Sequence, residues 1–220
     1  MIGIVVPAHN EEEHLPGCVA ALRRAASHPA LDGETVRMLV VLDHCTDGSR
    51  ALCRQLAVPH LRVWARRVGV ARHVGASRLI AQGARWIAFT DADTVVADDW
   101  LVSQLAQDAD AVCGTVAVND WSAHGDQADA VREAFAARYT DAEGHRHVHG
   151  ANLGVSAECY RRSGGCPPVS ASEDVALVQA LIACGARIAW SAAPRVLTSA
   201  RKRARASGGF ADTLLQWAQA

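Results

Sequence analysis

The first half of the chain alternates short apolar runs with longer stretches of helical character, and this order restricts the fold strongly. Four apolar runs have the length and β-branched content of buried strands: 2–6, 36–42, 61–64 and 85–89. Three stretches between them carry apolar residues at helical spacing: 11–27, 46–57 and 68–82. Strands and helices that alternate in this way form a mostly parallel sheet with helices on both faces. The sequence therefore predicts an α/β fold.

The composition indicates one globular domain with a sizeable core. The chain has 220 residues, of which 50% are hydrophobic and 20% are charged. A net charge of −1 argues against a nucleic-acid-binding protein, which needs a basic face. No apolar run approaches the ~20 residues that span a bilayer, and the first residues lack a signal-peptide pattern, so we expect a cytoplasmic protein. The seven cysteines include no Cys-X-X-Cys pair, which favours reduced thiols over disulfides or a zinc site.

The second half of the chain is less regular. Helices are expected in four places: 98–107, 126–139, and two stretches that begin near Ala157 and Ala211. A strand is expected over 111–118 and a polar loop over 141–149. Asp98 is expected to cap the first of these helices. No linker or internal repeat separates this half from the first, so we expect one domain.

Polar residues gather where three of the predicted strands end, at 7–12, 43–49 and 91–93. The carboxyl ends of parallel strands meet at one edge of a sheet, where a crevice suits a nucleotide. Asp91 and Asp93 offer hard oxygen donors for Mg²⁺ or Mn²⁺, which keep positions open for phosphate oxygens. Each cluster alone could also consist of helix caps and turns, but the three together favour the crevice.

Four motifs resemble those of family 2 glycosyltransferases, which have the GT-A fold. Segment 6–12 reads VPAHNEE and is similar to their opening motif, and segment 42–49 reads LDHCTDGS and resembles their second motif. Segment 70–76 reads VARHVGA and resembles an Ala-Arg-Asn-x-Gly helix, with His73 in place of Asn. Segment 91–93 matches their Asp-x-Asp. The resemblance implies a GT-A-like single domain, with a Rossmann-like donor half over about 1–95 and an acceptor half over about 96–220.

The resemblance also implies an activity, a cofactor and a set of donor-binding residues. The enzyme would move one sugar from a nucleotide-diphosphate-sugar donor to a hydroxyl acceptor, with Mn²⁺ or Mg²⁺ as cofactor. Asp91 and Asp93 would hold the metal ion and the donor, Asp93 more directly. Arg72 would face the base or the diphosphate. The remaining donor-binding residues would be Pro7, Ala8, Asn10, Glu11 and Asp43.

Three histidines occur at alternate positions in the second half, His145, His147 and His149. They could share one face of a strand and bind zinc, although their spacing matches no clear zinc pattern. Solvated loop histidines are the simpler interpretation for His145 and His147. The resemblance implies that His149, Gly150 and Asn152 line the acceptor side of the site.

An acidic pair, Glu173 and Asp174, opens a predicted apolar helix. The apolar stripe of this helix is expected to comprise Val175, Val178 and Ile182, with Leu181 beside them. Acids at a helix N-terminus also favour the helix dipole, with Ser172 as a cap, so a structural interpretation is available. The resemblance instead implies an inverting enzyme in which Asp174 is the general base that takes the acceptor's proton, while Glu173 positions the acceptor.

A basic stretch runs from Arg195 with no acid before Asp212. It could be a solvated loop, a peripheral membrane-contact patch, or a loop that closes over the donor's diphosphate. We favour the last interpretation, with three donor-binding arginines: Arg201, Arg203 and Arg205. The chain has no histidine after His149, whereas many relatives supply a late histidine to the metal. It also lacks the Gln-x-x-Arg-Trp motif of processive membrane relatives, so we expect a non-processive enzyme without a transmembrane segment.

Two alternative functions are compatible with the same residues. A nucleotidyltransferase would use a nucleoside triphosphate at a similar acidic metal site, but its Gly-rich phosphate loop is missing near the first strand. A non-catalytic nucleotide-sugar-binding protein would keep the crevice without turnover. The sequence does not identify the sugar, the base or the acceptor.

Overall fold

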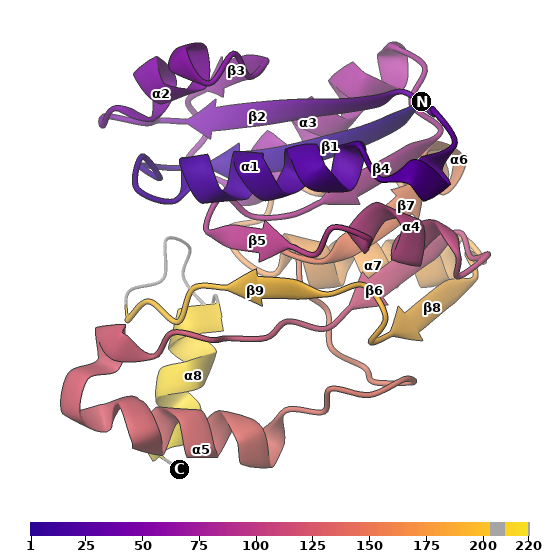
Figure 1. Ribbon diagram of the computed structural model, residues 1–220. Coiled ribbons are helices and arrows are strands. Elements are labelled where there is room, and N and C mark those ends of the chain that lie inside the picture. The colour runs from indigo at the N-terminus through magenta and orange to yellow at the C-terminus, as the bar shows by residue number, and fades with distance from the viewer. Residues whose placement is uncertain (203–209, 220) are drawn as a thin grey trace.

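The computed structural model describes residues 1–202 and 210–219 and centres on a seven-stranded sheet of order β3-β2-β1-β4-β7-β6-β8 (Figure 1). Its strands are β1 (Ile2–Ala8), β2 (Val36–Asp43), β3 (His60–Val63), β4 (Trp86–Phe89), β6 (Ala111–Gly114), β7 (Leu153–Ser156) and β8 (Ile188–Ser191). Only β7 runs antiparallel to its neighbours in this sheet. The predicted single α/β domain with a mostly parallel sheet is confirmed.

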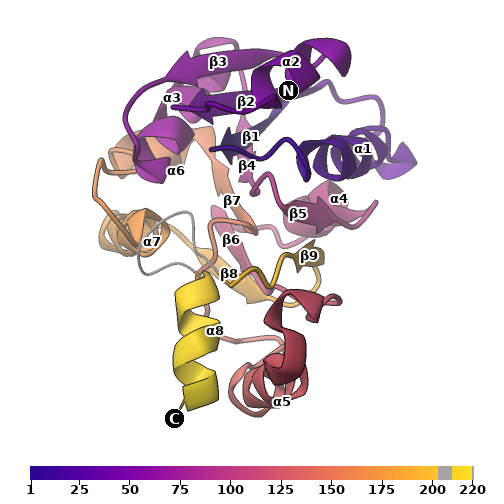
Figure 2. The same cartoon turned by 90° about the vertical axis from the view of Figure 1, so that its left-hand side faces the viewer.

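Helices cover both faces of this sheet (Figure 2). One face packs against α1 (Leu15–Ala26), α2 (Ser49–Gln55) and α4 (Trp100–Leu105). The other packs against α3 (Val68–Ala81), α6 (Ala157–Arg162) and α7 (Glu173–Ala183). Strand β1 contributes side chains to the hydrophobic cores on both faces of the sheet. Ile4 and Val6 face the core that includes α1, and Val5 faces the core that includes α3.

Small residues let α3 approach the sheet closely. A Cβ built on Gly75 would lie 2.6 Å from a methyl carbon of Val5, so only glycine fits there. The apolar residues at helical spacing in 68–82 are only partly buried. Leu79 is buried, whereas Val70 and Val74 are half-buried.

The expected face of α7 is only partly correct, and the expected cap of α4 is wrong. In α7, Val178 and Leu181 are buried together with Leu177, whereas Val175 and Ile182 are 37% and 57% exposed. In α4, the N-cap is Asp99 rather than Asp98. Asp98 forms an exposed ion pair with Arg24, with N and O atoms 2.8 Å apart.

Two smaller units lie outside the seven-stranded sheet. Strands β5 (Thr94–Val96) and β9 (Val196–Thr198) form an antiparallel pair in which Thr94 lies opposite Thr198. Helices α5 (Ala128–Arg138) and α8 (Phe210–Gln219) lie side by side at one end of the molecule (Figure 1). Short 3₁₀ helices are η1 (Pro29–Leu31) and η2 (Ser122–Gln127). In the described ranges, no helix has the length and apolar character to cross a membrane.

Candidate active site

The loops after β1 and β2 are bound to each other at one edge of the sheet. Asn10 has a positive φ of 56°, and its Oδ1 accepts hydrogen bonds from the backbone N–H of Thr46 at 2.8 Å and of Asp47 at 3.3 Å. The carboxylate of Glu12 accepts a hydrogen bond from the backbone N–H of Gly48 at 2.5 Å. These contacts explain why an amide, an acid and a glycine occur in the two motifs, since they connect the two loops.

Asp43, at the end of β2, fixes the chain that leads into α3. Its side chain is 5% exposed. One carboxylate oxygen accepts from the backbone N–H of Ala65 at 2.8 Å and of Arg66 at 3.0 Å, and the other accepts from Arg67 at 2.9 Å. Asp43 therefore anchors residues 65–67. Its expected contact with the donor stays a prediction.

Two histidine rings flank the same edge and were not singled out from the sequence. The rings of His9 and His44 are nearly parallel, at 12°, with centroids 6.4 Å apart. His9 Nδ1 donates to the backbone oxygen of Asp43 at 2.7 Å, and His44 Nε2 accepts from Arg66 at 2.5 Å. His9 lies inside the VPAHNEE motif, and its position at the end of a predicted strand was the signal that could have identified it from the sequence. Pro7 and Ala8, by contrast, are buried within β1.

Arg72 connects two acidic groups from distant parts of the chain. It lies on α3 and is 4% exposed. Its guanidinium donates to Asp91 Oδ1 at 2.5 Å and to Glu173 Oε1. A Cβ built on Gly150 would fall inside the guanidinium group, so glycine is required beside it. We expected Arg72 to face the donor and Glu173 to face the acceptor; in the structure they pair with each other.

The charges in this cluster perturb one another. Burial raises the pKa of Asp91 and of Glu173, and the neighbouring Arg72 only partly opposes this. Burial by itself would lower the pKa of Arg72, but the two carboxylates outweigh it and raise that pKa. Arg72 therefore stays charged, and its removal would leave the buried Glu173 and the half-buried Asp91 without a counter-ion.

Arg201 reaches the acids on the other side of the crevice. Its guanidinium forms two hydrogen bonds to the Glu11 carboxylate, at 2.8 and 3.0 Å, and one to Asp93 Oδ2. Glu11 is 5% exposed, so this expected donor-binding residue is a buried partner of Arg201. Burial by itself would lower the pKa of Arg201, but the hydrogen bond to Glu11 and the charge of Asp93 raise it. The predicted donor-binding residues Arg203 and Arg205 lie outside the described residues.

Asp174 stands at the start of α7, beside the Arg72 cluster. Its Oδ2 accepts a hydrogen bond from the backbone N–H of Gly150 at 2.8 Å, and its Oδ1 accepts one from Val175 at 2.8 Å. The side chain is half-buried, whereas Glu173 is buried. Gly150, expected on the acceptor side, therefore fixes the orientation of Asp174.

Asn152 does not fit the acceptor role expected for it. Its side chain has no exposed surface. Its Oδ1 accepts from the indole N–H of Trp100 at 2.8 Å, and its Nδ2 donates to the backbone oxygens of Thr115 at 2.7 Å and Pro194 at 2.9 Å. An amide with these partners has no surface for a sugar hydroxyl, so it stabilises the turn that carries Gly150.

The three alternate histidines differ from each other in the structure. The expectation of a solvated His145 is wrong: it is 3% exposed, and its Nδ1 accepts from the backbone N–H of His147. His147 is half-buried and stacks on Tyr139, with ring centroids 4.2 Å apart. Within the described ranges no group of three or more His, Cys, Asp or Glu side chains could hold a metal ion, so the zinc alternative has no support.

His149 forms a buried polar link to Tyr139. The Tyr139 hydroxyl accepts from the backbone N–H of Val116 at 2.8 Å and lies 3.0 Å from His149 Nε2. The Tyr139 hydroxyl therefore contacts both a backbone N–H and the His149 ring. Burial lowers the pKa of His149 to about 4, although Asp174 opposes this, so the ring is neutral at pH 7.

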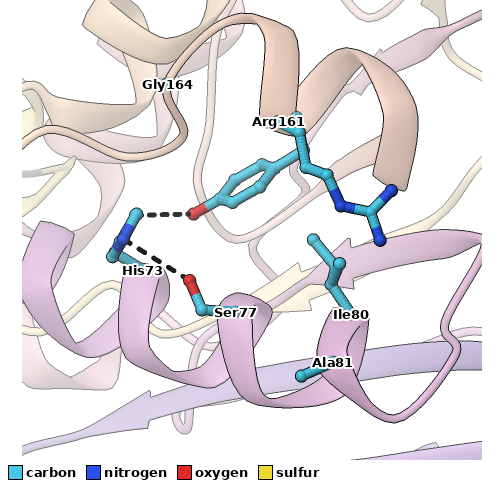
Figure 3. Close-up of a pocket in the computed structure, with 7 residues that line it drawn as sticks. His73, Ser77, Ile80, Ala81, Arg161 and Gly164 are labelled. Carbon is cyan, nitrogen blue, oxygen red and sulfur yellow. Dashed lines mark hydrogen bonds between the residues drawn. The ribbon is translucent and has the colours of Figure 1, made fainter.

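His73, which replaces the family's Asn, faces a separate pocket of about 390 Å³ between α3 and α6 (Figure 3). Figure 3 shows its ring between the hydroxyl groups of Ser77 and Tyr160, at 3.4 and 3.5 Å. The pocket's lining residues include none of the acids described above. His73 therefore does not take part in the acidic crevice.

The acids at the crevice suit a divalent cation whose remaining coordination positions are filled by phosphate oxygens. Asp91 contacts Arg72, and Asp93 contacts Arg201, through one carboxylate oxygen each. Mg²⁺ is commonly held by one or two carboxylates together with water and substrate phosphates, rather than by an all-protein cage. The guanidinium beside Asp93 also shows that a cation is accommodated there.

Three solved structures with the same fold are distant in sequence. S. aureus TarS 1–349 in complex with UDP-GlcNAc has a TM-score of 0.67 at 12% identity, over 99% of this chain and 65% of that one. GalNAc-T7 with UDP, GalNAc and Mn²⁺ has a TM-score of 0.65 at 14% identity, over 90% and 43%. The mannosyltransferase PcManGT from Pyrobaculum calidifontis, with GDP-Man and Mn²⁺, has a TM-score of 0.63 at 17% identity, over 93% and 58%.

These comparisons agree with the motifs that first suggested the fold. The chain spans less than two thirds of the length of each of these structures, and at such low identities the likeness shows the GT-A fold alone. No curated protein matches the sequence. The family model described as Glycosyl transferase family 2 matches residues 3–161, which cover most of the chain and include Glu11, Asp43, Asp91 and Asp93. The chain belongs to glycosyl transferase family 2.

Proposed function

We propose that this chain is a metal-dependent, non-processive glycosyltransferase that moves one sugar from a nucleotide-diphosphate-sugar donor to a hydroxyl acceptor with inversion. The observation that carries the proposal is the meeting of two acidic groups in one crevice. Asp91 and Asp93 follow β4, Glu173 and Asp174 open α7, and Arg72 joins the two groups. A cation site beside a half-buried carboxylate is what transfer from a diphosphate to a hydroxyl requires.

The donor would lie along the ends of β1, β2 and β4. The near-parallel rings of His9 and His44 offer faces on which a planar base can stack. Three structural neighbours were solved with UDP-GlcNAc, with UDP and Mn²⁺, and with GDP-Man and Mn²⁺, which supports a nucleoside diphosphate as the leaving group. A divalent ion held by Asp93 and Asp91 would neutralise that group as it departs.

Asp174 would serve the acceptor. The hydroxyl oxygen of the acceptor attacks the anomeric carbon, the bond from that carbon to the diphosphate oxygen breaks, and Asp174 takes the hydroxyl proton. The hydrogen bond from Gly150 to Asp174 holds the carboxylate in one orientation before the acceptor arrives. Because Glu173 is occupied by Arg72, Asp174 is the member of the pair that is available as a base.

The test is release of a nucleoside diphosphate from a panel of UDP- and GDP-sugars, with Mn²⁺ and hydroxyl acceptors. Asp174→Asn should lower kcat by about 100-fold or more and leave the thermal shift produced by Mn²⁺ and the nucleotide unchanged. Asp129→Asn, at an exposed acid on α5, is the matched control. Full turnover by a folded Asp174→Asn protein would contradict the proposal. Pyrophosphate release from a nucleoside triphosphate would favour a nucleotidyltransferase, and nucleotide binding without turnover would favour a binding protein.

A further inference from the structure

One guanidinium nitrogen of Arg201 is shared by carboxylates from two loops. Nη2 lies 3.0 Å from Glu11 Oε2 and also donates to Asp93 Oδ2. Glu11 follows β1 and Asp93 follows β4, so these oxygens converge although the acids are far apart in the sequence. A single positively charged nitrogen in contact with both oxygens marks the position of a cation site.

The β5–β9 pair explains how Arg201 reaches this site. Thr198, the last residue of β9, lies opposite Thr94, and their hydroxyl groups are 3.0 Å apart. Because the strands are antiparallel, the chain beyond Thr198 runs toward Asp93. Ala200 is 2% exposed, which fixes the backbone just before Arg201, whereas the Arg201 side chain is 18% exposed. The side chain can therefore leave the acids without displacing β9.

The formal charges around this position favour a cation, and His14 Nδ1 also lies 3.2 Å from Glu11 Oε2. Five carboxylates belong to Glu11, Asp91, Asp93, Glu173 and Asp174, and two guanidinium groups belong to Arg72 and Arg201. The acids are therefore in excess by three formal charges. An anionic diphosphate cannot enter such a crevice without added positive charge. A metal ion on Asp93 and the Arg201 guanidinium would repel each other if both used the same carboxylate.

We propose that Arg201 is the resident cation of the Glu11–Asp93 site in the free protein, and that a divalent metal ion arriving with the donor's diphosphate displaces it. The inference rests on the proposed function for the metal and the donor. It adds that Glu11 belongs to the cation site and that metal binding is an exchange of one cation for another. The displaced guanidinium is then available to the diphosphate, the contact expected for Arg201 from the sequence.

The experiment is Mn²⁺ titration followed by the electron paramagnetic resonance signal of free Mn²⁺, without nucleotide and with UDP or GDP. Wild type must displace Arg201, so its apparent affinity for Mn²⁺ is lowered by that competition. Arg201→Gln should bind Mn²⁺ at least about 10-fold more tightly than wild type without nucleotide. Arg201→Lys keeps a competing charge and should bind Mn²⁺ nearly as weakly as wild type.

Arg195→Gln is the matched control, because Arg195 lies in the same basic stretch and forms an exposed pair with Asp141 at 2.5 Å. Its affinity for Mn²⁺ should equal that of wild type. Circular dichroism establishes that each variant is folded. Equal or weaker Mn²⁺ binding by folded Arg201→Gln, with wild type binding Mn²⁺ in the presence of a nucleotide, would overturn the exchange and leave the proposed function standing. Absence of Mn²⁺ binding by every variant, with and without either nucleotide, would overturn the metal dependence as well.

Discussion

Replacement of Arg72 by methionine tests whether the two acidic groups depend on one buried cation. Arg72 is 4% exposed, and the Glu173 side chain is 5% exposed. Removing one partner of a buried ion pair costs about 3–5 kcal/mol, because the other charge stays buried without compensation. In a chain of this size each kcal/mol lowers Tm by about 2–4 °C, so Arg72→Met should lower Tm by about 6–20 °C.

The same substitution should make stability depend more strongly on pH. Burial already raises the pKa of Glu173 above its ordinary value of 4.5, and the loss of Arg72 raises it further. A carboxyl with a raised folded pKa stabilises the fold below the unfolded pKa, and this contribution is lost as pH rises through the folded pKa. The free energy of unfolding of Arg72→Met should therefore fall further below that of wild type at pH 8 than at pH 5.

Urea unfolding at both pH values measures these effects in five proteins: wild type, Arg72→Met, Glu173→Gln, their combination and a control. Arg72→Met should recover at least about 1 kcal/mol when combined with Glu173→Gln, because the double variant no longer buries that charge. Arg24→Met is the control, since the Arg24–Asp98 pair is exposed and should contribute less than about 1 kcal/mol. A deficit for Arg72→Met as small as that of the control, or the same deficit in the Glu173→Gln background, would refute the reasoning.

Two further predictions concern the turn that carries Gly150. The pKa of His149 is lowered from 6.5 to about 4, so its contribution to stability is present above pH 6.5 and is lost as pH falls toward 4. Urea unfolding should therefore show that the free energy of unfolding falls by up to about 3 kcal/mol over this pH range. His149→Gln should remove this pH-dependent loss. A pH-dependence equal in both proteins would contradict the buried neutral ring. Asn152→Ala should lower the free energy of unfolding by about 3 kcal/mol or more, because the Trp100 indole N–H and two buried carbonyl groups lose their partner. A loss below about 1 kcal/mol in chemical denaturation would show that water replaces the amide.

The sequence predicted the first half of the fold well because its periodic patterns are long. The run 2–6 became β1 (Ile2–Ala8), and the pattern over 68–82 became α3 (Val68–Ala81). Short strands of the second half were not predicted, since β7 (Leu153–Ser156) and β9 (Val196–Thr198) have too few apolar residues to form a pattern. The face of α7 was only partly right because apolar residues occur all around that helix, so spacing alone does not identify the buried side.

The candidate site shows the same division between local and distant information. Motifs placed Asp91, Asp93 and Asp174 at one crevice, because each follows a strand end or opens a helix. The partners of Arg72 and Arg201 were not predictable from local patterns. The Arg72–Glu173 pair spans 101 residues and the Arg201–Glu11 pair spans 190, and only tertiary packing brings these residues together.

The two crevice arginines have opposite abilities to move, and this divides the site into a fixed side and an exchangeable side. Arg72 is enclosed by Asp91, Glu173 and the backbone of Gly150, so its departure would leave the buried Glu173 and the half-buried Asp91 without a counter-ion. Arg201 is partly exposed and follows a strand of three residues, so only its side chain has to turn. Because Gly150 also binds Asp174, the Arg72 side would hold the proposed base in place, while the Arg201 side would respond to metal and donor. A donor would therefore meet a base that is already oriented, and the free energy of its binding would be reduced chiefly by the exchange at Glu11 and Asp93.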